Sequence, residues 1–118
     1  MQATIYGVPF LSANCYVPIT GSIVVIEGFS GTSSTSTSYP RISLAIQGYT
    51  KTTGTFPINQ SGTGVTAAYY TSSTNNVNGI SGSVTITSAS TTSIVGTFNF
   101  ICTDSTKVEG GSFTSKGY

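Results

Sequence analysis

The chain of 118 residues has no histidine, no tryptophan and very few charges, with four basic and three acidic side chains. Without histidine, the base that activates the nucleophile of a Ser-His-Asp triad or a Cys-His pair is missing. A zinc site usually needs histidine or clustered cysteines, and the chain has only two cysteines. We therefore expect no metal site, no cofactor and no nucleophilic catalysis.

The three carboxylates, Glu27, Asp104 and Glu109, decide the remaining catalytic option. Calcium sites use several carboxylates at close spacing, which three scattered residues do not supply. A hydrolase that works with two carboxylates would need two of them in one pocket. Asp104 and Glu109 flank one loop, but no pocket signal accompanies them. We expect that the protein is not an enzyme.

The charged residues do not gather into a patch, and the net charge is +1. Nucleic-acid binding domains carry a basic stripe, and a polybasic membrane anchor needs clustered Lys and Arg. Neither pattern occurs here. The longest aliphatic run, residues 23–26, is far shorter than the roughly 20 residues of a membrane-spanning helix. We expect no nucleic-acid partner and no transmembrane segment.

About a third of the residues are serine or threonine, while 6% are charged, against about a quarter in an ordinary soluble domain. Residues 1–20 contain no export signal, because they lack a basic start and an apolar stretch. Either the chain is cytosolic or its signal has been removed. The hydroxyl-rich, weakly charged composition favours the second alternative, and hence an extracellular or cell-surface location.

The sequence has no helical periodicity, and its clearest pattern is a hairpin over residues 79–103. In its first half, Ile80, Val84 and Ile86 alternate with serine and threonine. In its second half, one face collects the residues Ile94, Phe98, Phe100 and Cys102. Residues 88–93, which are polar apart from Ala89, form the turn between them. A period of two with one apolar face predicts an antiparallel pair buried on one side.

Similar short runs fill the rest of the chain, with strands predicted over 2–6, 10–19, 22–27, 41–49, 54–58, 65–71 and 108–115. In the second run, polar residues alternate with an apolar set that is expected on the inner face: Leu11, Ala13, Cys15 and Val17. Pro9 indicates an edge strand or the start of a strand, and Gly110 with Gly111 indicates a bulge or a close backbone approach. We predict one domain, 1–118, that is all-β without helices. It is an antiparallel sandwich of about eight or nine strands, or alternatively a small up-and-down barrel.

Cys15 and Cys102 both fall on predicted inward faces. An even number of cysteines in an exported protein indicates a disulfide, which would close a long loop. The alternative is two buried thiols that act as small apolar side chains. We predict the disulfide.

Seven tyrosines are the other notable feature. Exposed tyrosine stacks on sugars and mediates protein contacts. The candidate contact residues are Tyr16, Tyr69, Tyr70 and Tyr118. The alternative is that their rings cover the edges of the core.

Several segments in this order resemble a family of uncharacterised function, made up of small exported proteins, often lipid-anchored, from Bacteroidetes-type bacteria. The matching segments are ATIYGVPF (3–10), VVIEG (24–28), GTF (54–56), AYY (68–70), SGSVTIT (81–87), IVGTFNF (94–100) and GSF (111–113). The resemblance implies an exported all-β domain. It transfers no catalytic or ligand-binding residue, and the anchoring N-terminal cysteine of lipid-anchored members has no counterpart here.

Two functions from different classes fit these features. The first is a structural or assembly protein at the cell surface that associates with itself through unpaired β-edges into a filament or layer, since a near-zero net charge removes repulsion between copies. The second is a surface carbohydrate-binding or adhesion module that uses tyrosines and polar loops. Ice binding through threonine ladders such as Thr85 and Thr87 is a weaker third hypothesis, because the spacing is irregular.

Overall fold

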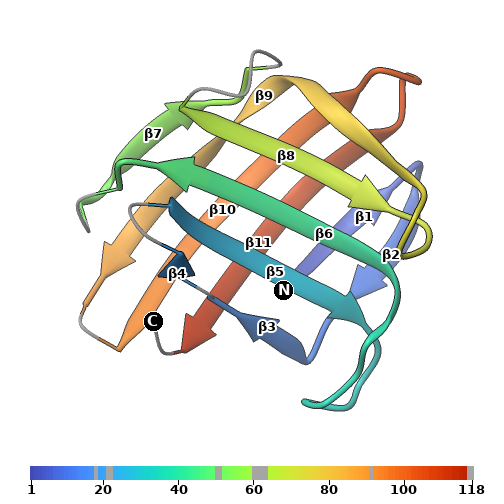
Figure 1. Cartoon of the computed structure of the whole chain (residues 1–118), viewed down its shortest axis with the longest axis horizontal. Helices are drawn as coiled ribbons and strands as arrows, with labels where there is room; N and C mark the ends of the chain where they lie inside the picture. The colour runs from blue at the N-terminus through green and yellow to red at the C-terminus, as the bar shows by residue number, and fades with distance from the viewer. Residues whose placement is uncertain (18, 21–22, 50–51, 60–63, 91, 117–118) are drawn as a thin grey trace.

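The protein is built from β-strands, as a computed structural model shows (Figure 1). The structure describes residues 1–17, 19–20, 23–49, 52–59, 64–90 and 92–116. Its strands are β1 (Gln2–Ile5), β2 (Val8–Leu11), β3 (Asn14–Tyr16), β4 (Ile19–Thr20), β5 (Ile23–Ser30), β6 (Ser38–Gln47), β7 (Gly54–Pro57), β8 (Val65–Tyr70), β9 (Asn76–Ala89), β10 (Ser93–Cys102) and β11 (Lys107–Lys116). Within this described part, no helix is long and apolar enough to cross a membrane.

The strands form one sheet in the order β10-β9-β8-β6-β5-β3-β11-β1-β2, with β4 beside β5 and β7 beside β9. Among the described residues, the named strands pair antiparallel except for one parallel contact between β3 and β11, and β10 also pairs with β11. The sheet curls into a half-barrel, so that β5, β6 and β8 cross in front of β9, β10 and β11 in Figure 1. We call these the front layer and the back layer. The predicted antiparallel all-β class is confirmed, and the curl is compatible with a sandwich or a barrel.

The core lies between the two layers because each strand turns every second side chain inward. Ile26, Ile42 and Leu44 from the front layer have no exposed surface. From the back layer, Val84 and Phe100 are equally enclosed. The outward positions of the front layer are thereby left free for another role.

The predicted hairpin is confirmed as β9 and β10, and its inward face contains the buried residues Val84, Ile86, Ile94, Phe98, Phe100 and Cys102. The prediction for Ile80 is wrong, since 41% of this side chain is exposed. The pairing register shifts between Ile101 and Cys102, which adds one residue to β9 beside Ile80. Such a bulge reverses the side to which the preceding residues point.

The predicted strand 10–19 is also wrong, because the chain turns a corner within it. β2 ends at Leu11 and pairs with β1, whereas β3 begins at Asn14 and pairs with β5 of the front layer. Ser12 stabilises the corner by donating its hydroxyl proton to the Asn14 carbonyl oxygen at 2.9 Å. The alternation does not survive the corner, and Leu11 is 52% exposed while Val17 is buried.

The predicted glycine bulge in β11 is confirmed. The register between β1 and β11 shifts between Gln2 and Thr4, opposite Gly110 and Gly111. Gly110 has a φ of +58°, and a Cβ atom on Gly111 would lie 2.5 Å from the Phe98 ring. The bulge therefore depends on both glycines.

Candidate functional site

The outer face of the front layer is ordered by strand register. Alternation directs every second residue of β5, β6 and β8 outward, and antiparallel pairing sets these residues opposite one another. Three rows result: Val25–Ala45–Thr66, Glu27–Ser43–Ala68 and Phe29–Arg41–Tyr70. Small side chains occupy the first two rows apart from Glu27, and large ones occupy the third.

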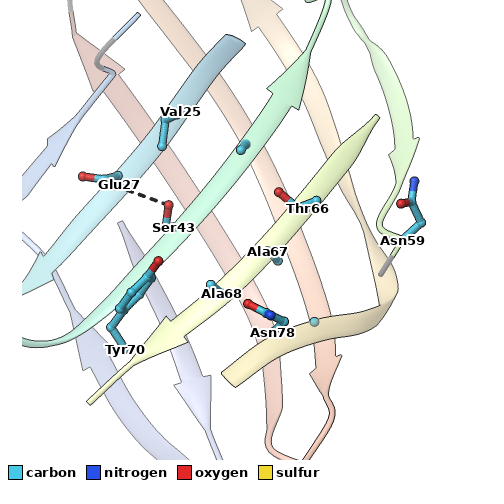
Figure 2. Close-up of a pocket in the computed structure, with 11 residues that line it drawn as sticks. Val25, Glu27, Ser43, Asn59, Thr66, Ala67, Ala68, Tyr70 and Asn78 are labelled. Atoms are coloured by element: carbon cyan, nitrogen blue, oxygen red, sulfur yellow. Dashed lines mark hydrogen bonds between the residues drawn. The ribbon is translucent and has the colours of Figure 1, made fainter. Parts of the chain in front are cut away.

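This difference in side-chain size hollows the face into a groove of about 390 Å³ (Figure 2). Small residues of the first two rows line its floor, among them Ser43, Ala45 and Ala68, and Tyr70 of the third row lies at one end (Figure 2). The full set of lining residues is Val25, Glu27, Ser43, Ala45, Asn59, Thr66, Ala67, Ala68, Tyr70, Asn78 and Gly79. The groove thus combines one aromatic ring with hydroxyl, amide and carboxylate groups.

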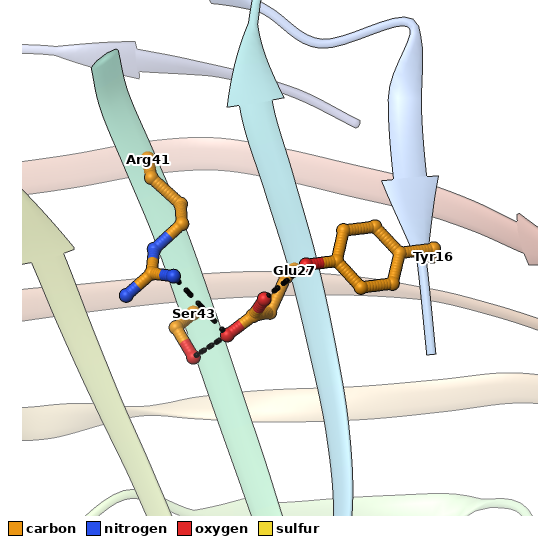
Figure 3. Close-up of polar contacts among 4 residues, drawn as sticks. All are labelled: Tyr16, Glu27, Arg41 and Ser43. Carbon is orange, nitrogen blue, oxygen red and sulfur yellow. Dashed lines mark hydrogen bonds and ion pairs between the residues drawn. The ribbon is translucent and has the colours of Figure 1, made fainter. Parts of the chain in front are cut away.

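A polar cluster fixes Glu27 beside the groove (Figure 3). Tyr16 donates its hydroxyl proton to Glu27 Oε2 at 2.7 Å, and Ser43 donates to Oε1 at 3.4 Å. Arg41 Nη1 lies 3.7 Å from the same Oε1, with both side chains largely buried. Burial and the hydrogen bond to Glu27 raise the pKa of Tyr16 to about 12. The carboxylate is held in place from two neighbouring strands.

Arg41 also holds the aromatic side chains of this face. Its guanidinium carbon lies 3.9 Å from the centre of the Tyr70 ring and 5.4 Å from that of Phe29. Phe29 in turn stacks on Tyr16 and meets Tyr39 edge to face, with ring centres 6.2 and 6.0 Å apart. Phe29 is buried but lies outside the main core, so these rings form a separate outer cluster.

The structure brings two of the four predicted contact tyrosines together. Tyr70 lies on the outer face of β8, and Tyr16 lies on the same side of the sheet, on β3 next to β5. Tyr69 faces the opposite side, where it packs against the core and burial raises its pKa. Tyr118 lies outside the described residues.

The sequence analysis missed the role of Glu27 and Arg41. A signal for it was present, since each is a lone charge at an outward position of an otherwise uncharged strand. Finding their contact would have required the register, which places Phe29 opposite Arg41 and Glu27 opposite Ser43. The pair then becomes a diagonal neighbour pair across two strands.

The outer face of the back layer is different. The register aligns Thr55, Thr85, Thr97 and Ser112 across four strands. The hydroxyl groups of Thr55 and Thr85 lie 3.1 Å apart. Thr97 at the centre of this row is exposed. This face presents short hydroxyl side chains without an aromatic or charged neighbour in the row.

The predicted disulfide is absent, and both Cys15 and Cys102 are free thiols. Cys15 contacts Ser115 near the end of β11, whereas the Cys102 amide donates to Thr106 just before β11 begins. Eight strand residues at about 3.3 Å each separate those two places, far more than the roughly 7 Å that a disulfide allows between Cα atoms. Burial raises the pKa of both thiols, that of Cys102 to about 11.

The three carboxylates are dispersed over the fold. Glu27 lies on β5, Glu109 is exposed on β11, and Asp104 occupies the turn between β10 and β11. Asp104 accepts a hydrogen bond from the Thr106 amide at 3.0 Å, and its contacts with Thr106 lower its pKa. Among the described residues, no group of three or more His, Cys, Asp or Glu side chains could hold a metal ion.

The edge strand β2 presents few free backbone groups. The Gly31 amide donates to the Leu11 carbonyl oxygen at 2.9 Å, so the backbone polar groups of Leu11 point away from β1. The backbone of Pro9, two residues earlier, has the same orientation, and proline has no N–H group. The edge prediction from Pro9 is confirmed, and the same residue blunts this edge against pairing with a further strand.

A second cavity, of about 440 Å³, lies beside the β1–β2 hairpin. It is lined mainly by apolar side chains, among them Ile5, Val8, Phe10 and Pro40. The most exposed large apolar side chains of the described chain lie on this hairpin, with Tyr6 at 60% and Val8 at 64%. The hairpin is the most apolar part of the described surface.

Comparison with family models, with curated proteins and with solved structures finds no match to this chain. The resemblance to an exported bacterial family stays a prediction. The class that fold and site define is an antiparallel all-β domain with a shallow polar and aromatic groove on one outer face.

Proposed function

We propose that the protein is a non-enzymatic carbohydrate-binding module that acts outside the cell. The observation that carries the proposal is the groove over β5, β6 and β8, in which Tyr70 stands beside a floor of small residues. The groove volume lies in the range of about 300–1,000 Å³ that is usual for small-ligand sites.

Sugars need this combination of groups. The C–H face of a pyranose ring packs on the face of an aromatic ring, and tyrosine combines an apolar ring with a polar hydroxyl at its tip. Each sugar hydroxyl both donates and accepts hydrogen bonds, and Ser43, Thr66, Asn78 and Glu27 offer both kinds of partner. The cation–π contact from Arg41 restrains the Tyr70 ring before the ligand arrives, which reduces the entropy lost on binding.

The dispersed carboxylates and the absence of histidine support a binding role rather than catalysis. The composition supports a location outside the cell, because about a third of the residues are serine or threonine and only 6% are charged. The non-enzymatic role and the location outside the cell are both parts of the proposal.

Binding of immobilised and soluble oligosaccharides tests the proposal. Ala68→Gln fills the groove floor without adding charge, and Tyr70→Ala removes the ring. We expect saturable binding by the unchanged protein and at least a tenfold loss in either variant. Thr97→Gln is the matched control, since it enlarges an exposed strand position on the back layer. Absence of binding across a broad glycan panel, or equal loss in the control, contradicts the proposal.

Self-association is the second candidate, and the exposed apolar hairpin favours it. Because Pro9 blunts the β2 edge, contact there would use the side chains of Tyr6, Val8 and Leu11. The outer side of β7 has no strand partner among the described residues and offers an edge for pairing. Sedimentation at increasing concentration tests this candidate. A concentration-dependent assembly that Val8→Lys abolishes supports hairpin contact, and a monomer at all concentrations contradicts it.

A further inference from the structure

Glu27 is the only charged residue that lines the described groove. Its carboxylate already accepts hydrogen bonds from Tyr16 and Ser43, yet a carboxylate has about four acceptor positions. It therefore retains capacity to accept a hydrogen bond from a ligand hydroxyl. A ligand anion placed beside it would meet a like charge in a partly desolvated site.

The nearest cation, Arg41, cannot form an ion pair with such an anion without losing its present contacts. Arg41 is paired with Glu27 at 3.7 Å and is packed against the Tyr70 ring at 3.9 Å. Its Nε atom is buried, and only 19% of the side chain is exposed. To reach a carboxylate or sulfate on a sugar, Arg41 would have to leave Glu27 as a largely buried charge without a cation.

The remaining lining groups are uncharged. Ser43 and Thr66 contribute hydroxyls, and Asn59 and Asn78 contribute amides. These groups pair equally well with donors and acceptors, as the hydroxyls of a neutral sugar require. The electrostatics of the groove therefore distinguish between ligands that share the same ring but differ in charge.

We propose that the groove selects uncharged glycans over glycans that carry a carboxylate or sulfate group, and that the Glu27–Arg41 pair sets this selectivity. The inference rests on the proposed carbohydrate binding and names its ligand class. Arg41 acts here as a positioning residue, through Glu27 and Tyr70, rather than as a ligand contact.

The test compares binding to pairs of oligosaccharides that differ only by a sulfate or by a C6 carboxylate. The unchanged protein should bind the neutral member at least tenfold more tightly, with little change in that affinity between low and high salt. Glu27→Gln keeps an oxygen that accepts from Tyr16 but releases the charge of Arg41, so the preference should shift at least tenfold toward the anionic member. Glu109→Gln, an exposed change of the same charge on β11, is the control and should leave the ratio unchanged.

The outcomes separate the two proposals. Equal or tighter binding of the anionic member by the unchanged protein overturns the selectivity while carbohydrate binding stands. Failure to bind any member overturns the proposed function and the selectivity with it. If folded Glu27→Gln keeps the same ratio of affinities for the neutral and anionic members, the role of the Glu27–Arg41 pair is overturned. The comparison in the unchanged protein needs no variant, so a variant that does not fold leaves the first half of the inference testable.

Discussion

The two outer faces of the curled sheet have similar backbones but different chemistry. On the front layer, Arg41 contacts both Glu27 and Tyr70, and these two residues line a groove. On the back layer, Thr85 and Thr97 stand in a row of short hydroxyls. The difference teaches that a hydroxyl-rich composition does not by itself build a site. The site arises where single large side chains stand beside small ones in register.

The first and largest expected effect concerns how the back layer is held together. Gly82 has a φ of +121°, and a Cβ there would lie 2.1 Å from the Asn99 carbonyl oxygen. Gly82→Ala should lower the free energy of unfolding by more than about 3 kcal/mol, because strain and overpacking add. Denaturant unfolding measures it. Gly48→Ala is the control, because it also has a positive φ but meets no atom within 4 Å, and it should cost clearly less.

The second prediction concerns the front-layer cluster. Arg41→Ala removes the ion pair and the ring contact and leaves Glu27 without its cation. Breaking a buried pair costs about 3–5 kcal/mol, and the partial exposure of both side chains lowers our expectation to about 1–3 kcal/mol. Chemical denaturation gives the value. A loss below about 0.5 kcal/mol, as at an ordinary surface position, means that the cluster does not stabilise this face.

The third prediction uses pH. The pKa of Tyr16 is raised from 10.0 to about 12 in the folded protein, so its contribution to stability is fully present below pH 10. As the pH rises from about 10 to 12, that contribution is lost. The unfolding free energy should therefore fall over this range, and less steeply in Tyr16→Phe. Identical slopes in the two proteins contradict the raised pKa of Tyr16, which burial and the hydrogen bond to Glu27 cause.

The smallest effect is expected on the back-layer threonines. Thr85→Val removes an exposed hydroxyl contact with Thr55 while keeping the branched shape that strands favour. The free energy of unfolding should change by less than about 0.5 kcal/mol. A thermal or denaturant midpoint reports the change. A loss of unfolding free energy as large as that of Arg41→Ala would contradict the difference between the two faces.

The sequence was sufficient for the strand class and for the inward faces of the hairpin, because a period of two survives wherever pairing is regular. It was insufficient at the corner before Asn14 and at the bulge beside Ile80. At these places the sequence keeps its alternating pattern, but the backbone turns a corner or shifts its pairing register. Local patterns contain no information on such register shifts.

The candidate site shows the same limit. Tyr70 could be predicted as a contact residue, but its neighbour Tyr69 could not be told apart from it without the orientation of β8. Cys15 and Cys102 both occur in alternating apolar patterns. In the structure, Cys15 lies near the end of β11 and Cys102 lies near its beginning. Distances between strands far apart in sequence decide both questions.

Chemical-shift mapping by NMR during titration with a neutral oligosaccharide tests the central claim most directly. The account predicts saturable shifts confined to the front face, at the amides of Ser43, Ala68 and Tyr70, with Thr85 and Thr97 unchanged. Shifts centred on the back-layer threonines, or no shifts with any neutral glycan of a broad panel, would contradict it.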